Sequence, residues 1–277
     1  MDGVEQLRGA RTKLQRAEEH FGQLMAEHER FIRDRNPYRM LPENDPHPDF
    51  DTLWRVKIVE HPPLEKWSSI TGECVHALRS ALDHTAYALV QINRLGTDYA
   101  EFPIFKDKYV TNRATGAVLL DKTGKPRLRW QESAAKKLPG VGREPLPQMK
   151  WLQPYRRRDG DERFHALWVI HEMDVIDKHR RLNIVKPLVR DLTYHTTDCE
   201  IVNDEVLAGP FEDGTVIAHY RARPTRPNAK MHVQAEFLFD VLFGDGEPLQ
   251  GEPVMQTLQG LLAYTGAVIS RFDRFFA

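Results

Sequence analysis

The first part of the chain has the residue spacing of a long amphipathic helix. Apolar side chains recur at intervals of three, four and seven residues with charged residues between them. They are Val4, Leu7, Leu14, Phe21, Leu24, Met25, Phe31 and Ile32, with His28 in the same register. The sequence "RNPY" ends the pattern, because a residue before proline is disfavoured in a helix. We therefore predict a helix over residues 3–35.

Three later stretches have a similar helical period. In residues 65–95, one stripe about 100° wide contains seven side chains, namely Cys74, Leu78, Ala81, Leu82, Thr85, Leu89 and Ile92. Residues 163–186 are apolar on more than one side, which predicts a central position, and 253–276 again carry one apolar stripe. The sequence predicts four long antiparallel helices.

Strand patterns lie between these helices. Residues 52–60 alternate apolar and polar side chains, whereas "MLPENDPHPDFD" before them has the proline and aspartate content of a loop. Residues 190–242 contain further strand patterns separated by Gly and Asp turns. We predict an α+β fold, in which a helical bundle of long antiparallel helices carries one small antiparallel β-sheet. The first strand and the last helix must return to elements distant in sequence, so residues 1–277 are predicted to form a single integrated domain.

Residues 106–144 break the periodic pattern and are basic. Ten Lys and Arg residues stand there against four acidic residues, and turn residues are frequent. This loop-rich insertion is either a solvated flap or an arm that binds a polyanion such as RNA. In the second case the RNA-binding candidates are Lys122, Lys125, Arg127 and Arg129.

The composition sets further limits on function. The chain has 39 basic and 40 acidic side chains and a formal net charge of −1, so no global field attracts nucleic acid. Cys74 and Cys199 lack metal-type spacing, which favours reduced thiols. No signal-peptide pattern and no run of 18 apolar residues occurs, so we expect a cytoplasmic protein without membrane contact.

The segment "HALRSALDHTAY", residues 76–87, carries the most chemically suggestive side chains. On a helical wheel, five ionisable groups fall outside the apolar stripe: His76, Arg79, Asp83, His84 and Tyr87. An arginine can hold a phosphate, and a histidine can exchange protons near neutral pH. Such a pair can cleave RNA through its own 2′-hydroxyl without a metal or cofactor. A solvated helix face would carry the same kind of residues, so both interpretations stay open.

The residues from Arg79 to His84 read R-S-A-L-D-H, which resembles the R-x4-H motif of HEPN-domain ribonucleases. The resemblance implies a helical fold, a homodimer with two motifs facing each other, and a metal-independent endoribonuclease activity. Arg79 and His84 would be the catalytic pair, and Ser80 would take the polar position after the arginine. "ALRSALDHTAYALV", "HEMDVIDKHRRL" and "FGDGEPLQGEPV" also resemble segments of a family of bacterial hypothetical proteins without an assigned activity.

Other residues are candidates for supporting roles. His76, Asp83 and Tyr87 share the polar face of the helix with the catalytic pair, and His171 and Lys178 fall within the apolar stripe of the third helix. A lysine in such a stripe needs an acidic partner. Asp174, four residues earlier, and Asp83 on the other helix are the two candidates.

Two observations keep alternatives to a ribonuclease open. The spacing R-x4-6-H occurs five times in the chain, and only Arg79/His84 lies wholly inside a strongly periodic helix. These two residues are about 140° apart at 100° per residue, so one chain cannot easily direct both at one phosphate. The same face could instead serve a non-catalytic interaction or dimerisation protein. A metal site is the second alternative, with ligands from His76, Asp83, His84, His171, Asp174, Asp177 and His179.

Overall fold

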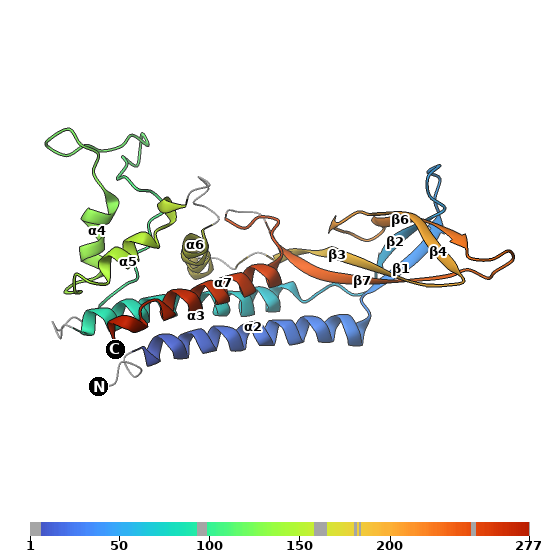
Figure 1. Cartoon of the computed structure of the whole chain (residues 1–277), viewed down its shortest axis with the longest axis horizontal. Coiled ribbons are helices and arrows are strands. Elements are labelled where there is room, and N and C mark those ends of the chain that lie inside the picture. Colours follow the sequence, from blue (N-terminus) through green and yellow to red (C-terminus); the bar gives the residue numbers. More distant parts are fainter. Residues whose placement is uncertain are drawn as a thin grey trace.

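The computed structural model describes residues 7–92, 99–157, 165–179, 182, 184–244 and 248–276, with only the backbone of Val185. The molecule is elongated, with three long helices toward one end and the β-strands at the other (Figure 1). The start of α2 (Arg8–Arg35) and the end of α7 (Val254–Ser270) lie at the helical end (Figure 1). The α+β character and the antiparallel strand pairing agree with the prediction.

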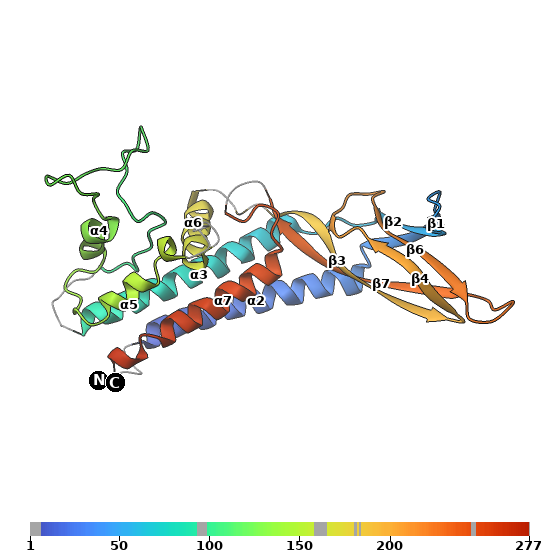
Figure 2. The same ribbon diagram turned by 45° about the horizontal axis from the view of Figure 1, so that its top comes forward.

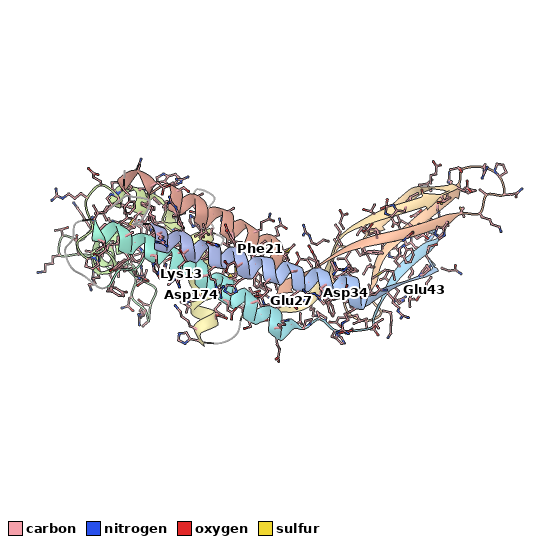
Figure 3. The ribbon with its side chains drawn as sticks, turned by 90° about the horizontal axis from the view of Figure 1, so that it is seen from below. Lys13, Phe21, Glu27, Asp34, Glu43 and Asp174 are labelled. Carbon is pink, nitrogen blue, oxygen red and sulfur yellow. The ribbon has the colours of Figure 1, made fainter. Side chains whose placement is uncertain are left out.

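The first long helix, α2 (Arg8–Arg35), keeps a seven-residue repeat along its length. Its fully or nearly buried positions are spaced by seven residues: Ala10, Ala17, Leu24 and Phe31. Asn36 follows in the left-handed conformation at φ 43°, and Pro37 cannot continue the helix. The predicted end at residue 35 is confirmed, while residues 3–6 lie outside the described part of the chain. Figure 3 shows Lys13, Phe21, Glu27 and Asp34 following one another along this helix.

Helices α3 (Leu64–Gln91) and α7 (Val254–Ser270) pack against α2 and against each other. α3 is the most buried of the three, because α2, α6, α7 and the start of β3 all contact it. Six of its seven predicted stripe residues are buried, whereas Ile92 is 40% exposed. α7 ends at Ser270, short of the predicted residue 276, and the 3-10 turn η3 (Asp273–Phe275) follows.

The prediction of four long helices in a bundle is wrong. Among the described residues there are six α-helices, and three of them are short: α4 (Arg129–Lys137), α5 (Leu146–Trp151) and α6 (Ala166–His179). The helix predicted over 163–186 corresponds to α6, which ends at His179. The chain from Ile184 onward belongs to strand β3 (Ile184–Thr197), where β-branched residues and pairing with another strand replace the helical pattern.

The strands form two antiparallel sheets and not the single predicted one. The first sheet has the order β1-β2-β6-β4, from β1 (Tyr38–Asn44), β2 (Thr52–Ile58), β6 (Val216–Pro224) and β4 (Cys199–Val206). The second has the order β5-β3-β7, from β5 (Gly209–Pro210), β3 and β7 (His232–Phe243). Met40–Asn44 begin the segment with the composition of a loop. They nevertheless form most of β1 and pair with β2.

Aromatic side chains fill the space between the two sheets. Tyr38 of β1 contacts Phe239 of β7 with ring centroids 4.7 Å apart. Tyr194 of β3 contacts Tyr220 of β6 at 5.5 Å. These contacts join strands that are far apart in sequence, and aromatic pairs add to the stability gained from burial alone.

The basic insertion, residues 106–144, is more ordered than its sequence suggests. Isolated antiparallel bridges join Tyr109 to Leu128 and Leu120 to Pro126, and α4 follows directly. No helix in the described part of the chain is long and apolar enough to cross a membrane. Cys74 and Cys199 are both buried and neither is in a disulfide.

Candidate functional site

Arg79 lies in the middle of α3 and is only 4% exposed. Its guanidinium donates to the carbonyl oxygen of Phe102 from both terminal nitrogens, at 3.2 Å each. Nη2 also lies 2.9 Å from Asp83 Oδ1 and 3.0 Å from Glu101 Oε1. All of these acceptors belong to α3 itself or to residues 101–102 further along the chain, so Arg79 fastens that segment to the helix.

The two carboxylates around Arg79 respond differently to their surroundings. Burial raises the pKa of Asp83, although the charge of Arg79 and the hydrogen bond from the backbone N–H of Phe102 act in the opposite direction. Burial also acts to raise the pKa of Glu101, but hydrogen bonds from Lys137 and Tyr99, together with the charges of Lys137 and Arg79, lower it overall. Glu101 is therefore the ionised centre of the group, shared by two cations.

Glu101, Tyr99 and Lys137 belong to this network although no sequence pattern predicted it. A buried guanidinium requires carboxylates, as a buried lysine does. The helical wheel places Arg79 outside the apolar stripe, and its burial arises only from contacts with residues 101–102, so no local pattern could indicate these partners.

His84 lies on a different side of α3 from Arg79 and is exposed. Its imidazole packs over Gly9 of α2, where a Cβ atom would come within 2.7 Å of His84 Nδ1. Partial burial and the positive charge of Lys13 lower the pKa of His84, so the ring is neutral at pH 7. Arg79 and His84 are therefore held by separate sets of contacts and do not form a pair within one chain.

A small pocket of about 280 Å³ lies next to His84. We call the residues that line it the tyrosine surface: Asp83, His84, Tyr87, Tyr99 and Ala100. Tyr87 is 39% exposed and Tyr99 is 58% exposed. This pocket brings together three residues of the predicted polar face and two that follow the helix.

His76 and Lys178 meet at a third place, around the buried carboxylate of Asp174. Asp174 is 2% exposed, and its two oxygens contact His76 Nδ1 at 2.9 Å and Lys178 Nζ at 2.5 Å. The predicted pairing of Lys178 with Asp174 is confirmed, while Asp83 pairs with Arg79. The expectation that Lys178 is buried in an apolar stripe is wrong. Asp174 is the buried partner, and Lys178 reaches it from the surface. Asp174 is visible beside α3 in Figure 3.

His171 is partly buried one turn before Asp174 on α6. Burial and the positive charges of Arg79 and Lys137 lower its pKa to about 4, so the ring is neutral at pH 7. Its Nδ1 atom is buried and has no hydrogen-bond partner in the described part of the chain. Trp168 packs beside it with ring centroids 5.6 Å apart.

The four RNA-binding candidates of the insertion differ in their availability. Arg127 forms a two-pronged ion pair with Glu132, at 2.5 and 2.7 Å, and the Nε atom of Arg129 is buried. Lys122 and Lys125 lie in the turn that the side chain of Asp121 organises, are exposed, and form no ion pair with any described residue. Of the four candidates, these two lysines are the most exposed to a polyanion.

The structure offers no support for the alternative of a metal site. Within the residues described, no three or more His, Cys, Asp or Glu side chains are arranged to hold a metal ion. The candidate ligands are divided between the surroundings of Arg79, of His84 and of Asp174. No protein-family model, no curated protein and no solved structure matches this chain.

Proposed function

We propose that the protein is a non-catalytic interaction protein that forms a homodimer through the tyrosine surface. One observation carries the proposal, namely that the Arg79 guanidinium is 4% exposed and already bonded to Asp83, Glu101 and Phe102. A phosphate could reach it only by displacing a carboxylate and exposing the segment that Arg79 holds. The motif arginine is thus suited to a structural role, which leaves the neighbouring exposed side chains for recognition.

The tyrosine surface has the chemistry of a protein interface. Tyrosines are enriched in interfaces because they combine apolar area with a polar tip. Here an exposed aromatic side chain and a pocket lie in the same patch. A two-fold symmetric dimer needs a patch that fits a copy of itself, so this combination favours a second copy of the chain as the partner.

The mass in solution tests the proposal. We expect the wild-type protein to have twice the monomer mass of 32.1 kDa by light scattering, and the Tyr87→Ser/Tyr99→Ser variant to be a monomer. Met231→Ser/Leu238→Ser is a matched control, because these side chains are also 51% and 56% exposed but lie in the sheet region. Circular dichroism would confirm that each variant is folded. A monomeric wild type, or a dimer that survives the tyrosine substitutions, would contradict the proposal.

A second candidate function is a metal-independent endoribonuclease of the HEPN-like type, with His84 as the proton-transferring residue. The observation in its favour is that His84 is exposed, has a lowered pKa, and lines a pocket with Asp83 and two tyrosines. A neutral imidazole can accept a proton from a 2′-hydroxyl. In a dimer formed through this surface, two copies of His84 would come close together.

Cleavage of labelled RNA in EDTA separates the two functions. A ribonuclease would cut RNA without a divalent ion and would lose this activity in His84→Ala. Arg79→Lys keeps a cation near Asp83 and Glu101, so it tests the arginine with less risk to folding than Arg79→Ala. An absence of cleavage by the wild-type dimer favours the interaction protein, whereas cleavage that persists in His84→Ala assigns the activity to another site.

A further inference from the structure

A second and larger pocket lies where α5 and the 3-10 turn η1 (Pro154–Arg156) meet the C-terminal half of α7. It has a volume of about 530 Å³, within the range of sites that take small organic ligands. We call it the arginine pocket, after Arg156, Arg157 and Arg271 in its lining. Figure 2 shows α5 next to the C-terminal part of α7.

The described lining of the arginine pocket is basic. None of the described residues in its lining has a carboxylate. Arg156 and Arg271 are exposed and form no ion pair with any described residue, whereas Arg11, Arg55, Arg79 and Arg127 each contact a carboxylate. Arginines directed to a concave site without an acidic partner are suited to bind an anion, because the guanidinium fork matches phosphate and carboxylate oxygens.

Aromatic side chains border the same pocket. The Arg271 guanidinium lies 5.0 Å from the ring of Trp151, which is 56% exposed. Stacking on an aromatic ring orients a guanidinium and leaves its N–H edges available. Tyr264 lies against His165 with ring centroids 5.6 Å apart, and its hydroxyl lies 3.4 Å from His165 Nε2.

Gln153 of the pocket lining is held in place by hydrogen bonds to the backbone. Gln153 is 1% exposed, and both the oxygen and the nitrogen of its side-chain amide form hydrogen bonds to the backbone. Its Oε1 accepts from the N–H of Phe105 at 2.9 Å, while Nε2 donates to the carbonyls of Pro103 and Met149 at 2.8 and 3.0 Å. A preorganised lining lowers the cost of ordering a site when a ligand binds.

From this combination we infer that the arginine pocket binds a phosphate monoester that carries a planar aromatic group. Arg156 and Arg271 hold the phosphate, and the exposed ring of Trp151 contacts the aromatic part. Aromatic stacking beside arginine favours a planar group over a bare anion. The site is separate from the tyrosine surface and does not depend on the proposed dimer.

Calorimetric titration tests this inference with three probes, namely phenyl phosphate, adenosine monophosphate and inorganic phosphate. We expect saturable binding of the two aromatic esters, at least tenfold tighter than that of inorganic phosphate. Arg156→Gln/Arg271→Gln should weaken ester binding at least tenfold. Trp151→Ala should reduce the preference for the esters while leaving the weak binding of inorganic phosphate unchanged.

Arg274→Gln is the matched control, because Arg274 is an exposed arginine near the end of α7 that does not line the pocket. It should bind the esters like the wild type. No saturable binding of either ester would overturn the inference, and so would an equal loss in Arg274→Gln and in the double variant. Equal affinity for inorganic phosphate and both esters would overturn the assignment of an aromatic ligand. Saturable binding of one ester, tenfold tighter than that of inorganic phosphate, would support the inference and identify which planar group the pocket accepts.

Discussion

Arg79 and the arginines of the arginine pocket belong to the same residue type but have opposite surroundings. Arg79 is buried and has two carboxylates and a carbonyl within hydrogen-bond distance. Arg156 and Arg271 are exposed, border a pocket and form no ion pair with described residues. The motif that attracts attention in the sequence contains the first kind, whereas the second kind lies outside any motif. The partners of an arginine, more than its sequence context, therefore decide whether it supports the fold or binds a ligand.

The largest effect expected from this comparison is on stability. Arg79→Met removes one partner of a buried ion-pair network and leaves Asp83 and Glu101 facing each other. Breaking such a network costs about 3 kcal/mol. Arg156→Met should change the free energy of unfolding by less than about 0.5 kcal/mol, as exposed positions do. Urea unfolding measures both, and an Arg79→Met protein as stable as the wild type would remove the structural role we assign to this residue.

The second effect is on how the stability of the protein depends on pH, through His171, whose pKa the charge of Arg79 affects. The pKa of His171 is lowered from 6.5 to about 4 in the folded protein. Below pH 6.5 the unfolded chain gains a proton that the folded protein does not accept until pH falls to about 4. His171 therefore destabilises the protein as pH falls between these values, by on the order of 2 kcal/mol.

Replacement of His171 by Phe should remove that part of the pH dependence. Relative to the wild type, His171→Phe should become more stable as pH decreases from about 7 to about 4.5, in urea unfolding at each pH. The control is His195→Gln, which changes a histidine on the exposed face of β3. Parallel stability curves for the wild type and His171→Phe would show that burial and the positive charges of Arg79 and Lys137 do not lower the pKa of this imidazole.

The packing of His84 predicts a smaller effect. In Gly9→Ala the new Cβ would come within 2.7 Å of His84 Nδ1, so we expect destabilisation of about 1 kcal/mol despite the better helix propensity of alanine. Gly22 lies on the same helix, and a Cβ added there would have nothing within 4 Å, so Gly22→Ala should stabilise by about 0.5–1 kcal/mol. If the contact is the cause, Gly9→Ala should become stabilising in a His84→Ala background.

These contacts also show why the sequence predicted some elements and not others. The seven-residue repeat of α2 depends on local spacing alone, so its course and its end at Arg35 could be predicted. β1 contains Pro42, which is unfavourable within a sheet, but it is an edge strand where a missing N–H is tolerated. The sequence did not predict the change from α6 to β3, because Leu182 and Val185 continue the helical spacing of Val175 past His179. Only the partner strand β7 determines that the chain from Ile184 onward is a strand.

The candidate site follows the same division between local and distant contacts. The helical wheel correctly separated Arg79 and His84, because their angular difference depends only on α3. It assigned both to a polar face, yet Arg79 is buried by residues 101–102, whose position is set by the tertiary structure. The arginine pocket joins residues more than 100 positions apart in the sequence, such as Arg156 and Arg271, so no local pattern could have revealed it.

The smallest expected effect is on RNA binding by the basic insertion, where paired and unpaired cations can also be compared. Lys122 and Lys125 are exposed without ion pairs to described residues, whereas Arg127 is bound to Glu132. If this arm contacts single-stranded RNA, Lys122→Gln/Lys125→Gln should weaken binding severalfold. It should also reduce the slope of log affinity against log salt by about 1.4, which corresponds to two lost phosphate contacts.

Arg127→Gln is the informative control in a filter-binding series at several salt concentrations. Because Arg127 already has a carboxylate partner, its removal should leave the salt slope unchanged. An equal reduction in Arg127→Gln would mean that RNA competes with Glu132 for the guanidinium, and that an ion pair in the free protein does not identify a structural arginine. The same reasoning would then reopen a phosphate-binding role for Arg79, whose carboxylate partners would no longer exclude it.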